Sequence, residues 1–240
     1  MILLAGCTAS RSTVRGDAAL TPDASTDALV LPVEPLPDGP PSHPSEWIAW
    51  PGEGVVGTSL LLKVSRWVGL SSLRKVSRRV PDDCSGLVRL AYLEAGLPLA
   101  PSEGKRGDNM TTALWRRVDR LGALRIADPK PGDLVFFSET YDRNRDGRRN
   151  DGLTHIGIVE EVLANGTVVF IHRGDNGVKR SRMNLLDGAR HKDENGEVLN
   201  DWLRRRDRKH RAYLAGELLT GFASPDTLVE EQSDASEPAS

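Results

Sequence analysis

The sequence has little cysteine, no long apolar run and no large excess of charge of either sign. Its 240 residues include two cysteines, Cys7 and Cys84, which are too few for a disulfide framework. Lys and Arg number 32 against 34 Asp and Glu, for a formal net charge of -2, so there is no long-range electrostatic reason to expect a nucleic-acid partner. No apolar run reaches the roughly 20 residues of a membrane-spanning helix. The length suits one domain with additional tails.

Residues 1–7 contain the run Leu4-Ala5-Gly6-Cys7, which resembles the lipobox at the processing site of bacterial lipoproteins. The thiol of Cys7 would be the atom that is acylated. Only six residues precede Cys7, fewer than a signal peptide needs, so we expect the true translation start to lie upstream. The resemblance predicts a lipoprotein of the cell envelope that faces the periplasm or the exterior. The alternative is a chance apolar start on a cytosolic chain.

Two segments have the composition of disordered chain. Residues 8–45 hold seven of the 15 prolines, mixed with Ser, Thr, Asp and Gly. Such a segment buries too little apolar surface to offset its chain entropy, and it suits a tether. The polar, acidic stretch 223–240 is predicted to be a disordered tail by the same criterion. These boundaries leave residues 46–222 as the folded domain.

Apolar spacing predicts helices in the first half of this domain. Apolar residues at intervals of four, four and three place one helical face on residues 55–67. A second helix is predicted to begin at Asp83, a favourable N-cap, and to end near Gly96.

Strands follow in the second half. The run DLVFF after Pro131-Gly132 predicts a strand, and residues 153–163 and 167–172 predict two more around an Asn165-Gly166 turn. Helices followed by a meander of strands indicate an α+β domain with helices packed on an antiparallel sheet.

Cys84 is predicted to lie in the first turn of the second helix. Unpaired backbone N–H groups at a helix start favour a thiolate, which would lower the thiol pKa. The same groups can stabilise the negative charge that develops on an attacked carbonyl. The alternative is a buried structural cysteine, because cysteine is among the most buried residue types.

Four ordered stretches resemble the NlpC-type cell-wall cysteine endopeptidases. These are DDCSGLVRLAYLEAGL around Cys84, KPGDLVFF at 130–137, THIGIVEEV at 154–162 and VFIHRGDNGVKRSRMN at 169–184. The resemblance implies a papain-like fold, with N-terminal helices on a central antiparallel sheet. It also implies a peptidase that hydrolyses peptidoglycan stem peptides at the bond between a D-glutamyl residue and the following diamino acid.

The resemblance assigns catalytic roles to two histidines. His155 would be the general base for Cys84, and His172 would orient His155 and select its tautomer. The alternative for His155 is an ordinary hydrogen-bonded strand histidine. A two-residue loop at Asn165-Gly166 would place Val159 opposite His172. His155 would then lie four residues away, about 13 Å on a flat ladder, so the prediction requires strong coiling of the strands.

The resemblance also places Asp83 and Ser85 on the substrate side of the site, although both residue types are common helix caps. The family usually has Tyr in a Tyr-x-x-Gly-Gly run before the cysteine. Trp67 is the nearest counterpart here and has no hydroxyl. Two other functions remain open: an amidase or acyltransferase with the same Cys and His, and a catalytically silent wall-binding module.

Residues 141–153 contain a candidate calcium loop. Oxygen donors at Asp142, Asn144 and Asp146, the Arg148 carbonyl and the Asn150 side chain have the spacing of an EF-hand loop, with Gly147 at the turn. The twelfth position is Leu153 rather than a carboxylate, so the alternative is a polar surface loop. The chemistry itself requires no cofactor, and calcium would act structurally.

Residues 190–211 are dense in charge and include LRRRDRKHR. We predict a solvated helix face, because charge runs usually lie on solvated surfaces. The alternative is a patch attracted to anionic cell-wall polymers.

Overall fold

Helices precede strands along the chain in this computed structural model, which describes residues 54–97, 99, 105 and 107–229. The helical elements are α1 (Val55–Trp67), the 3₁₀ helix η2 (Leu73–Lys75), α2 (Cys84–Glu94), α3 (Met110–Arg120) and α4 (Ala215–Leu218). The strands are β1 (Leu124–Arg125), β2 (Leu134–Ser138), β3 (Leu153–Val162), β4 (Thr167–Gly174), β5 (Gly177–Asn184), β6 (Trp202–Arg204), β7 (Tyr213–Leu214) and β8 (Leu219–Ala223).

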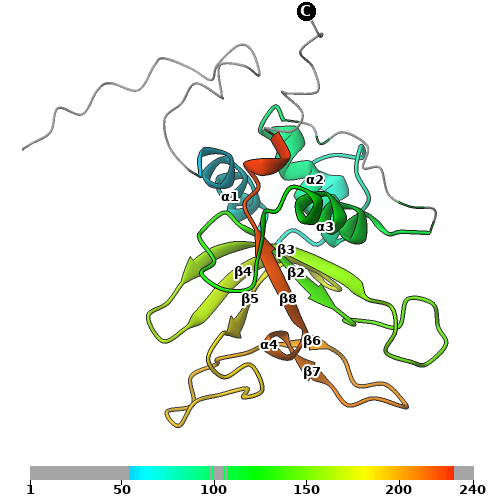
Figure 1. The fold of residues 1–240 in the computed structure, drawn as a ribbon, viewed down its shortest axis with the longest axis vertical. Helices are drawn as coiled ribbons and strands as arrows, with labels where there is room; N and C mark the ends of the chain where they lie inside the picture. Colours follow the sequence, from blue (N-terminus) through cyan, green and yellow to red (C-terminus); the bar gives the residue numbers. More distant parts are fainter. Residues whose placement is uncertain (1–53, 98, 100–104, 106, 230–240) are drawn as a thin grey trace, which may run out of the picture. The chain divides into compact units, whose positions relative to one another are not determined.

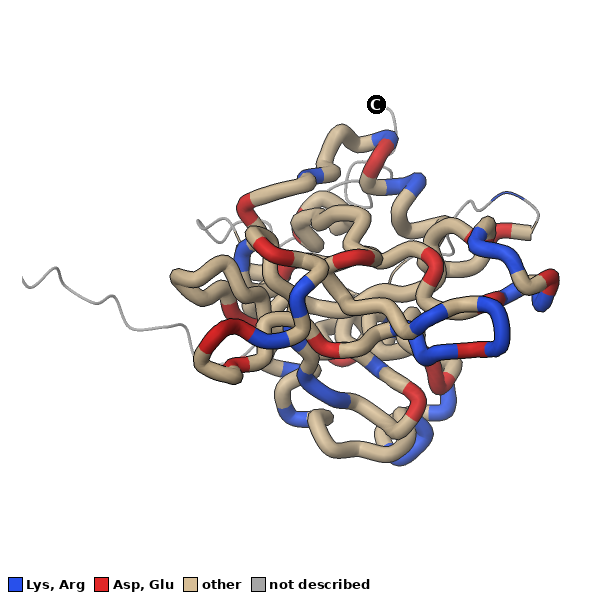
Figure 2. The backbone as a smooth tube through the Cα atoms, turned by 90° about the horizontal axis from the view of Figure 1, so that it is seen from below, with Lys and Arg blue, Asp and Glu red and all other residues tan. Residues whose placement is uncertain are grey.

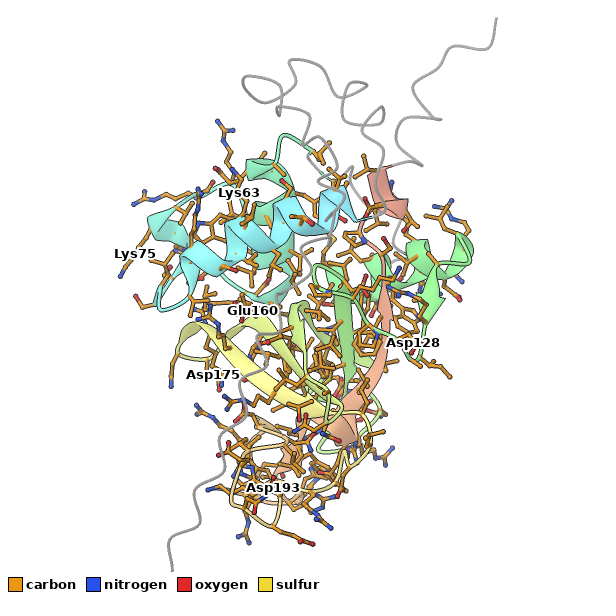
Figure 3. All side chains as sticks on the ribbon, turned by 90° about the vertical axis from the view of Figure 1, so that its left-hand side faces the viewer. Lys63, Lys75, Asp128, Glu160, Asp175 and Asp193 are labelled. Atoms are coloured by element: carbon orange, nitrogen blue, oxygen red, sulfur yellow. The ribbon has the colours of Figure 1, made fainter. Side chains whose placement is uncertain are left out.

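Six strands form an antiparallel sheet in the order β1-β8-β2-β3-β4-β5. Helices α1, α2 and α3 lie on one side of this sheet, and α4 with the β6–β7 pair lies on the other (Figure 1). In Figure 3, Lys63 and Lys75 mark the helical side and Asp193 marks the opposite end. This arrangement confirms the predicted α+β, papain-like fold.

The sheet is buried on both faces. Phe136 packs into the core under the helices, whereas its neighbour Phe137 packs into a second core with Ala215 and Leu218 of α4. Successive residues of a strand point to opposite faces, so a strand covered on both sides is apolar throughout. This explains the unbroken LVFF run of β2.

The two predicted helices form where expected. Leu60 and Val64 of α1 are fully buried on its predicted face. Asp83 has extended backbone, and its carboxylate accepts a hydrogen bond from the Gly86 N–H at 2.8 Å. Asp83 therefore caps α2 as predicted.

The predicted disordered tail is wrong for residues 223–229. Ala223 ends β8, and Leu228 is fully buried in the helical-side core. The Tyr92 hydroxyl donates a hydrogen bond to the Pro225 carbonyl at 2.8 Å, which secures this segment. The burial of its apolar residues offsets the conformational entropy that the segment loses on ordering. Composition alone had predicted that this entropy would dominate. The remainder of that tail, the 8–45 linker and Cys7 lie outside the described residues.

The prediction of a helix in residues 190–211 is also wrong. The segment contains the Lys192–Val198 bridge and strand β6. Gly196 has a left-handed φ of 84°, and the buried Asn200 side chain donates hydrogen bonds to two loop carbonyls. These turns and side-chain hydrogen bonds are incompatible with a continuous helix over residues 190–211. Among the described residues, no helix has the length and apolarity needed to cross a bilayer.

Candidate active site

Cys84 is the first residue of α2, which packs against β3. Its Sγ atom lies 3.9 Å from the Thr154 carbonyl oxygen, and the thiol donates to that oxygen. The short turn before the helix requires Gly86, because a Cβ there would overlap the Pro81 carbonyl oxygen. The sequence around the cysteine therefore serves to hold the thiol at the helix start, facing the sheet.

The two predicted histidines are in contact. His155 Nε2 on β3 lies 2.7 Å from His172 Nδ1 on β4, and His172 Nε2 lies 3.1 Å from the Ser181 hydroxyl on β5. All three side chains are buried. Three adjacent strands thus carry a continuous chain of polar atoms that begins at His155.

The strand register differs from the predicted one and brings the histidines closer. Ile158 pairs with Ile171, so Gly157 rather than Val159 lies beside His172. The connecting loop is longer than two residues, with Leu163 N–H bonded to the Thr167 carbonyl, and the ladder shifts again between Val159 and Glu161. A bulge of this kind also increases local twist. The histidines are two residues out of register instead of four, about 7 Å along the strand.

Gly157 leaves the space that His172 occupies. A Cβ at this position would lie 3.3 Å from His172 Cβ and 2.9 Å from the Ile171 carbonyl oxygen. A larger residue would therefore displace β4 or rotate the imidazole away from His155.

Cys84, His155 and His172 line one cleft of about 1200 Å³. The turn before α2, the start of α3 and the β4–β5 turn supply part of its wall. Residues between Thr140 and Gly147 and the segment Trp202–Lys209 supply most of the remainder. The cleft therefore joins the helix start, the ends of β3 and β4, and the β6–β7 side of the fold.

The family model of the NlpC/P60 family matches residues 66–188, just over half of the chain. The chain belongs to the NlpC/P60 family. Members of this family act on peptidoglycan and are generally cysteine peptidases associated with the cell wall. No solved structure matches the chain. The matched range includes the cysteine and both histidines but ends before the β6–β7 pair.

The electrostatics of this NlpC/P60 site favour neutral groups. Burial raises the pKa of the Cys84 thiol to about 11, and the Asp83 carboxylate acts in the same direction. Burial and the positive charge of Lys179 lower the pKa of His155 to about 4, and burial also lowers the pKa of His172. The expected lowering of the thiol pKa by the helix start is wrong, because desolvation outweighs it. At neutral pH the cleft therefore holds a protonated thiol and an uncharged imidazole.

We expect alkylation of Cys84 by iodoacetamide to be slow at pH 7 and to accelerate about tenfold per pH unit toward pH 10. Only the thiolate reacts, and a pKa of about 11 keeps its fraction small until the pH approaches that value. The rate is measured by mass spectrometry on the Cys84 peptide of the full chain, which separates it from Cys7. A plateau that begins below pH 7 would contradict the neutral thiol.

The other predicted substrate residues have different environments. Asp83 and Ser85 line the cleft, but the Ser85 hydroxyl donates to the Asp83 carboxylate at 2.8 Å as part of the cap. Trp67 is buried in the helical-side core and does not line the cleft, so it is not a substrate contact in this structure. Its predicted position beside the substrate is wrong because its helical face packs inward.

Tyr141 is a cleft residue that the sequence reasoning treated only as the start of a loop. It is half-exposed and lines the cleft with Cys84. Burial raises its pKa, and the neighbouring Cys84 contributes in the same direction. The sequence did contain a signal for Tyr141. The Tyr that the family usually has before the cysteine is absent here, so a Tyr from another segment could supply the hydroxyl.

The candidate calcium loop is closed by its own hydrogen bonds. Asp142 accepts from Gly147 N–H at 2.8 Å, and Asp146 accepts from Arg148 N–H at 2.7 Å and from the Asn150 side chain at 2.9 Å. Within the described ranges, no group of three or more His, Cys, Asp or Glu side chains converges as a metal site. One oxygen of Asp142 is nevertheless buried without a hydrogen-bond partner.

Proposed function

We propose that this NlpC/P60 protein is a cysteine endopeptidase that hydrolyses peptidoglycan stem peptides between a D-glutamyl residue and the next diamino acid. The observation that carries this proposal is the opening of Cys84 and the hydrogen-bonded His155–His172 pair into one cleft. A nucleophile at a helix start and a base oriented by a third group are the elements of thiol peptidase chemistry.

The hydrogen bonds define which nitrogen can act as the base. If His155 donates its Nε2–H to His172 Nδ1, and His172 donates its Nε2–H to Ser181, each contact has one donor and one acceptor. His155 Nδ1 then keeps a free lone pair. In our proposal this nitrogen takes the Cys84 proton, and the lowered pKa of His155 keeps it unprotonated at neutral pH.

The proposed reaction has two steps. The Cys84 sulfur bonds to the scissile carbonyl carbon, and His155 returns the proton to the departing amine as the C–N bond breaks. Water then attacks the thioester with His155 again accepting a proton, which releases the carboxylate and restores the thiol. Backbone N–H groups in the first turn of α2 can stabilise the oxyanion; the Gly86 N–H is already used by Asp83.

The test is digestion of peptidoglycan fragments by the full chain, followed by mass spectrometry. We expect stem-peptide fragments with a new amino terminus on the diamino acid, and none from Cys84→Ala. Products cut at an amide outside the peptide stem would identify an amidase instead. A folded protein that yields no product would favour the silent wall-binding module, for which the raised pKa of Cys84 is the supporting observation.

We also propose that Asp142, Asn144 and Asp146, with the Arg148 carbonyl and Asn150, bind calcium and stiffen the segment before His155. The partnerless oxygen of Asp142 fits a cation ligand. At 100 times its Kd, calcium would stabilise the fold by about 2.7 kcal/mol, which raises Tm by roughly 5–10 °C. Thermal unfolding with calcium, magnesium or a chelator measures this. If wild type and Asp142→Asn had equal Tm values in calcium, the proposed calcium site would be contradicted.

We further propose that Cys7 carries a lipid that anchors the protein to the membrane of the cell envelope. The support is the Leu4–Cys7 motif alone. Fractionation of cells that express the full gene should place the wild type with membranes and Cys7→Ser in the soluble fraction. Identical distributions would contradict the anchor.

A further inference from the structure

A basic loop forms one wall of the cleft. Residues 205–209, RRDRK, follow β6, and all five line the cleft together with Cys84 and His155. We call this segment the basic loop. It lies beyond residues 66–188, so it is an addition to the part of the chain that the family model describes. Figure 2 views the fold from the β6–β7 side and shows Lys and Arg in runs on the loops there.

The basic loop is held in place from beneath. Arg204 is buried, and its guanidinium donates to the Glu139 carbonyl at 2.8 Å and pairs with Asp207 at 3.3 Å. Asp207 also accepts hydrogen bonds from the Lys209 and His210 backbone N–H groups. A ligand would therefore meet a loop whose backbone is already ordered, which reduces the entropic cost of binding.

Its outward cations are not neutralised. Within the described part of the chain, no ion pair involves Arg206, Arg208 or Lys209, and the first two are exposed in the cleft wall. Arg205 instead pairs at 3.1 Å with Asp175 on the β4–β5 turn, which also lines the cleft. A cleft that is lined by both a nucleophile and unpaired guanidinium groups favours a substrate that carries carboxylates.

We propose that the basic loop binds the free carboxylates of an acidic peptidoglycan stem while the peptide lies across Cys84. Arg206 and Arg208 make the principal contacts, because a guanidinium matches a carboxylate in two-point geometry. This inference rests on the proposed peptidase function and adds a preference for stems whose carboxylates are not amidated. A shared cavity for the loop and the thiol favours the substrate over a separate wall polymer.

The test compares L-alanyl-γ-D-glutamyl-diaminopimelate with the same peptide amidated at its free carboxylates. Binding is measured by calorimetry on the full chain with Cys84→Ala, and KM and kcat on the otherwise unaltered chain. We expect the acid form to bind roughly tenfold more tightly at low salt and less so at high salt. Arg206→Glu with Arg208→Glu should remove the preference by raising Kd and KM for the acid form, with kcat unchanged.

The matched control is Arg74→Glu with Lys75→Glu, which makes the same change of charge on exposed residues of η2 that do not line the cleft. Figure 3 labels Lys75 on the helical side. It should keep the preference for the acid form. Equal binding of both peptides to the wild-type loop would overturn the inference, even if cleavage occurs. A loop variant that loses only adsorption to a phosphate polymer would also overturn it and assign the loop to the wall. Absence of cleavage with the binding preference intact would instead reject the peptidase function alone.

Discussion

Replacing His155 with Gln is expected to lower kcat by about 10³-fold or more. The amide preserves size and polarity but cannot accept the thiol proton, and a positioned general base contributes about 10² to 10⁴ in rate. His172→Gln should cost less, about 10- to 100-fold, because His172 acts through its 2.7 Å contact with His155. Rates on a stem peptide measure both effects.

The double variant distinguishes a relay from two independent contributions. When both histidines are replaced, kcat should be no lower than for His155→Gln, since the orienting residue has nothing left to orient. Multiplied losses would show that His172 contributes independently of His155. A near-normal kcat for His155→Gln would show that His155 is not the general base.

Gly86→Ala is expected to have the second-largest effect, on both stability and activity. The added methyl group would overlap the Pro81 carbonyl, and its backbone cannot yield without moving the first turn of α2. Strain of this kind typically costs about 1–3 kcal/mol, occasionally more. Because the moved turn carries Cys84, kcat should fall even under conditions where the variant remains folded. Urea unfolding and peptide hydrolysis provide the two measurements.

Gly96→Ala is the control for glycine loss alone. Gly96 has a left-handed φ of 76°, and no atom lies within 4 Å of the position of a Cβ. Its replacement should cost about 1 kcal/mol, through backbone strain at the helix end, and should leave kcat unaltered. If Gly86→Ala and Gly96→Ala had the same free energy of unfolding and the same kcat, the overlap with the Pro81 carbonyl would be relieved without loss of stability or activity.

Sequence patterns predicted the helices that are determined by local interactions. The spacing of Leu60 and Val64 and the Asp83 cap were sufficient for α1 and α2. Helix α3 also had readable signals that were not used: Asn109 caps it, and Leu114 and Val118 repeat at a helical interval. The tail was misjudged because composition cannot show that Leu228 finds a buried partner surface.

For the candidate site, the sequence predicted which residues would come together but not their geometry. The motifs around Cys84 and His155 predicted two residues that the structure places in one cleft. The distance between His155 and His172 depended on a bulge at residues 159–161. No composition signal marks that bulge. The basic loop reaches the cleft through the contact of Arg204 with Glu139, 65 residues away, which sequence spacing could not reveal.

The division of the site between two layers also affects biogenesis. Cys84 belongs to the helical layer, whereas His155, His172 and Ser181 belong to the sheet. Sulfur and imidazole come into one cleft only when the helical layer is docked on the sheet. Under the proposed mechanism, hydrolytic activity appears only when the last tertiary docking event is complete. The fold would then act as its own safeguard against premature proteolysis.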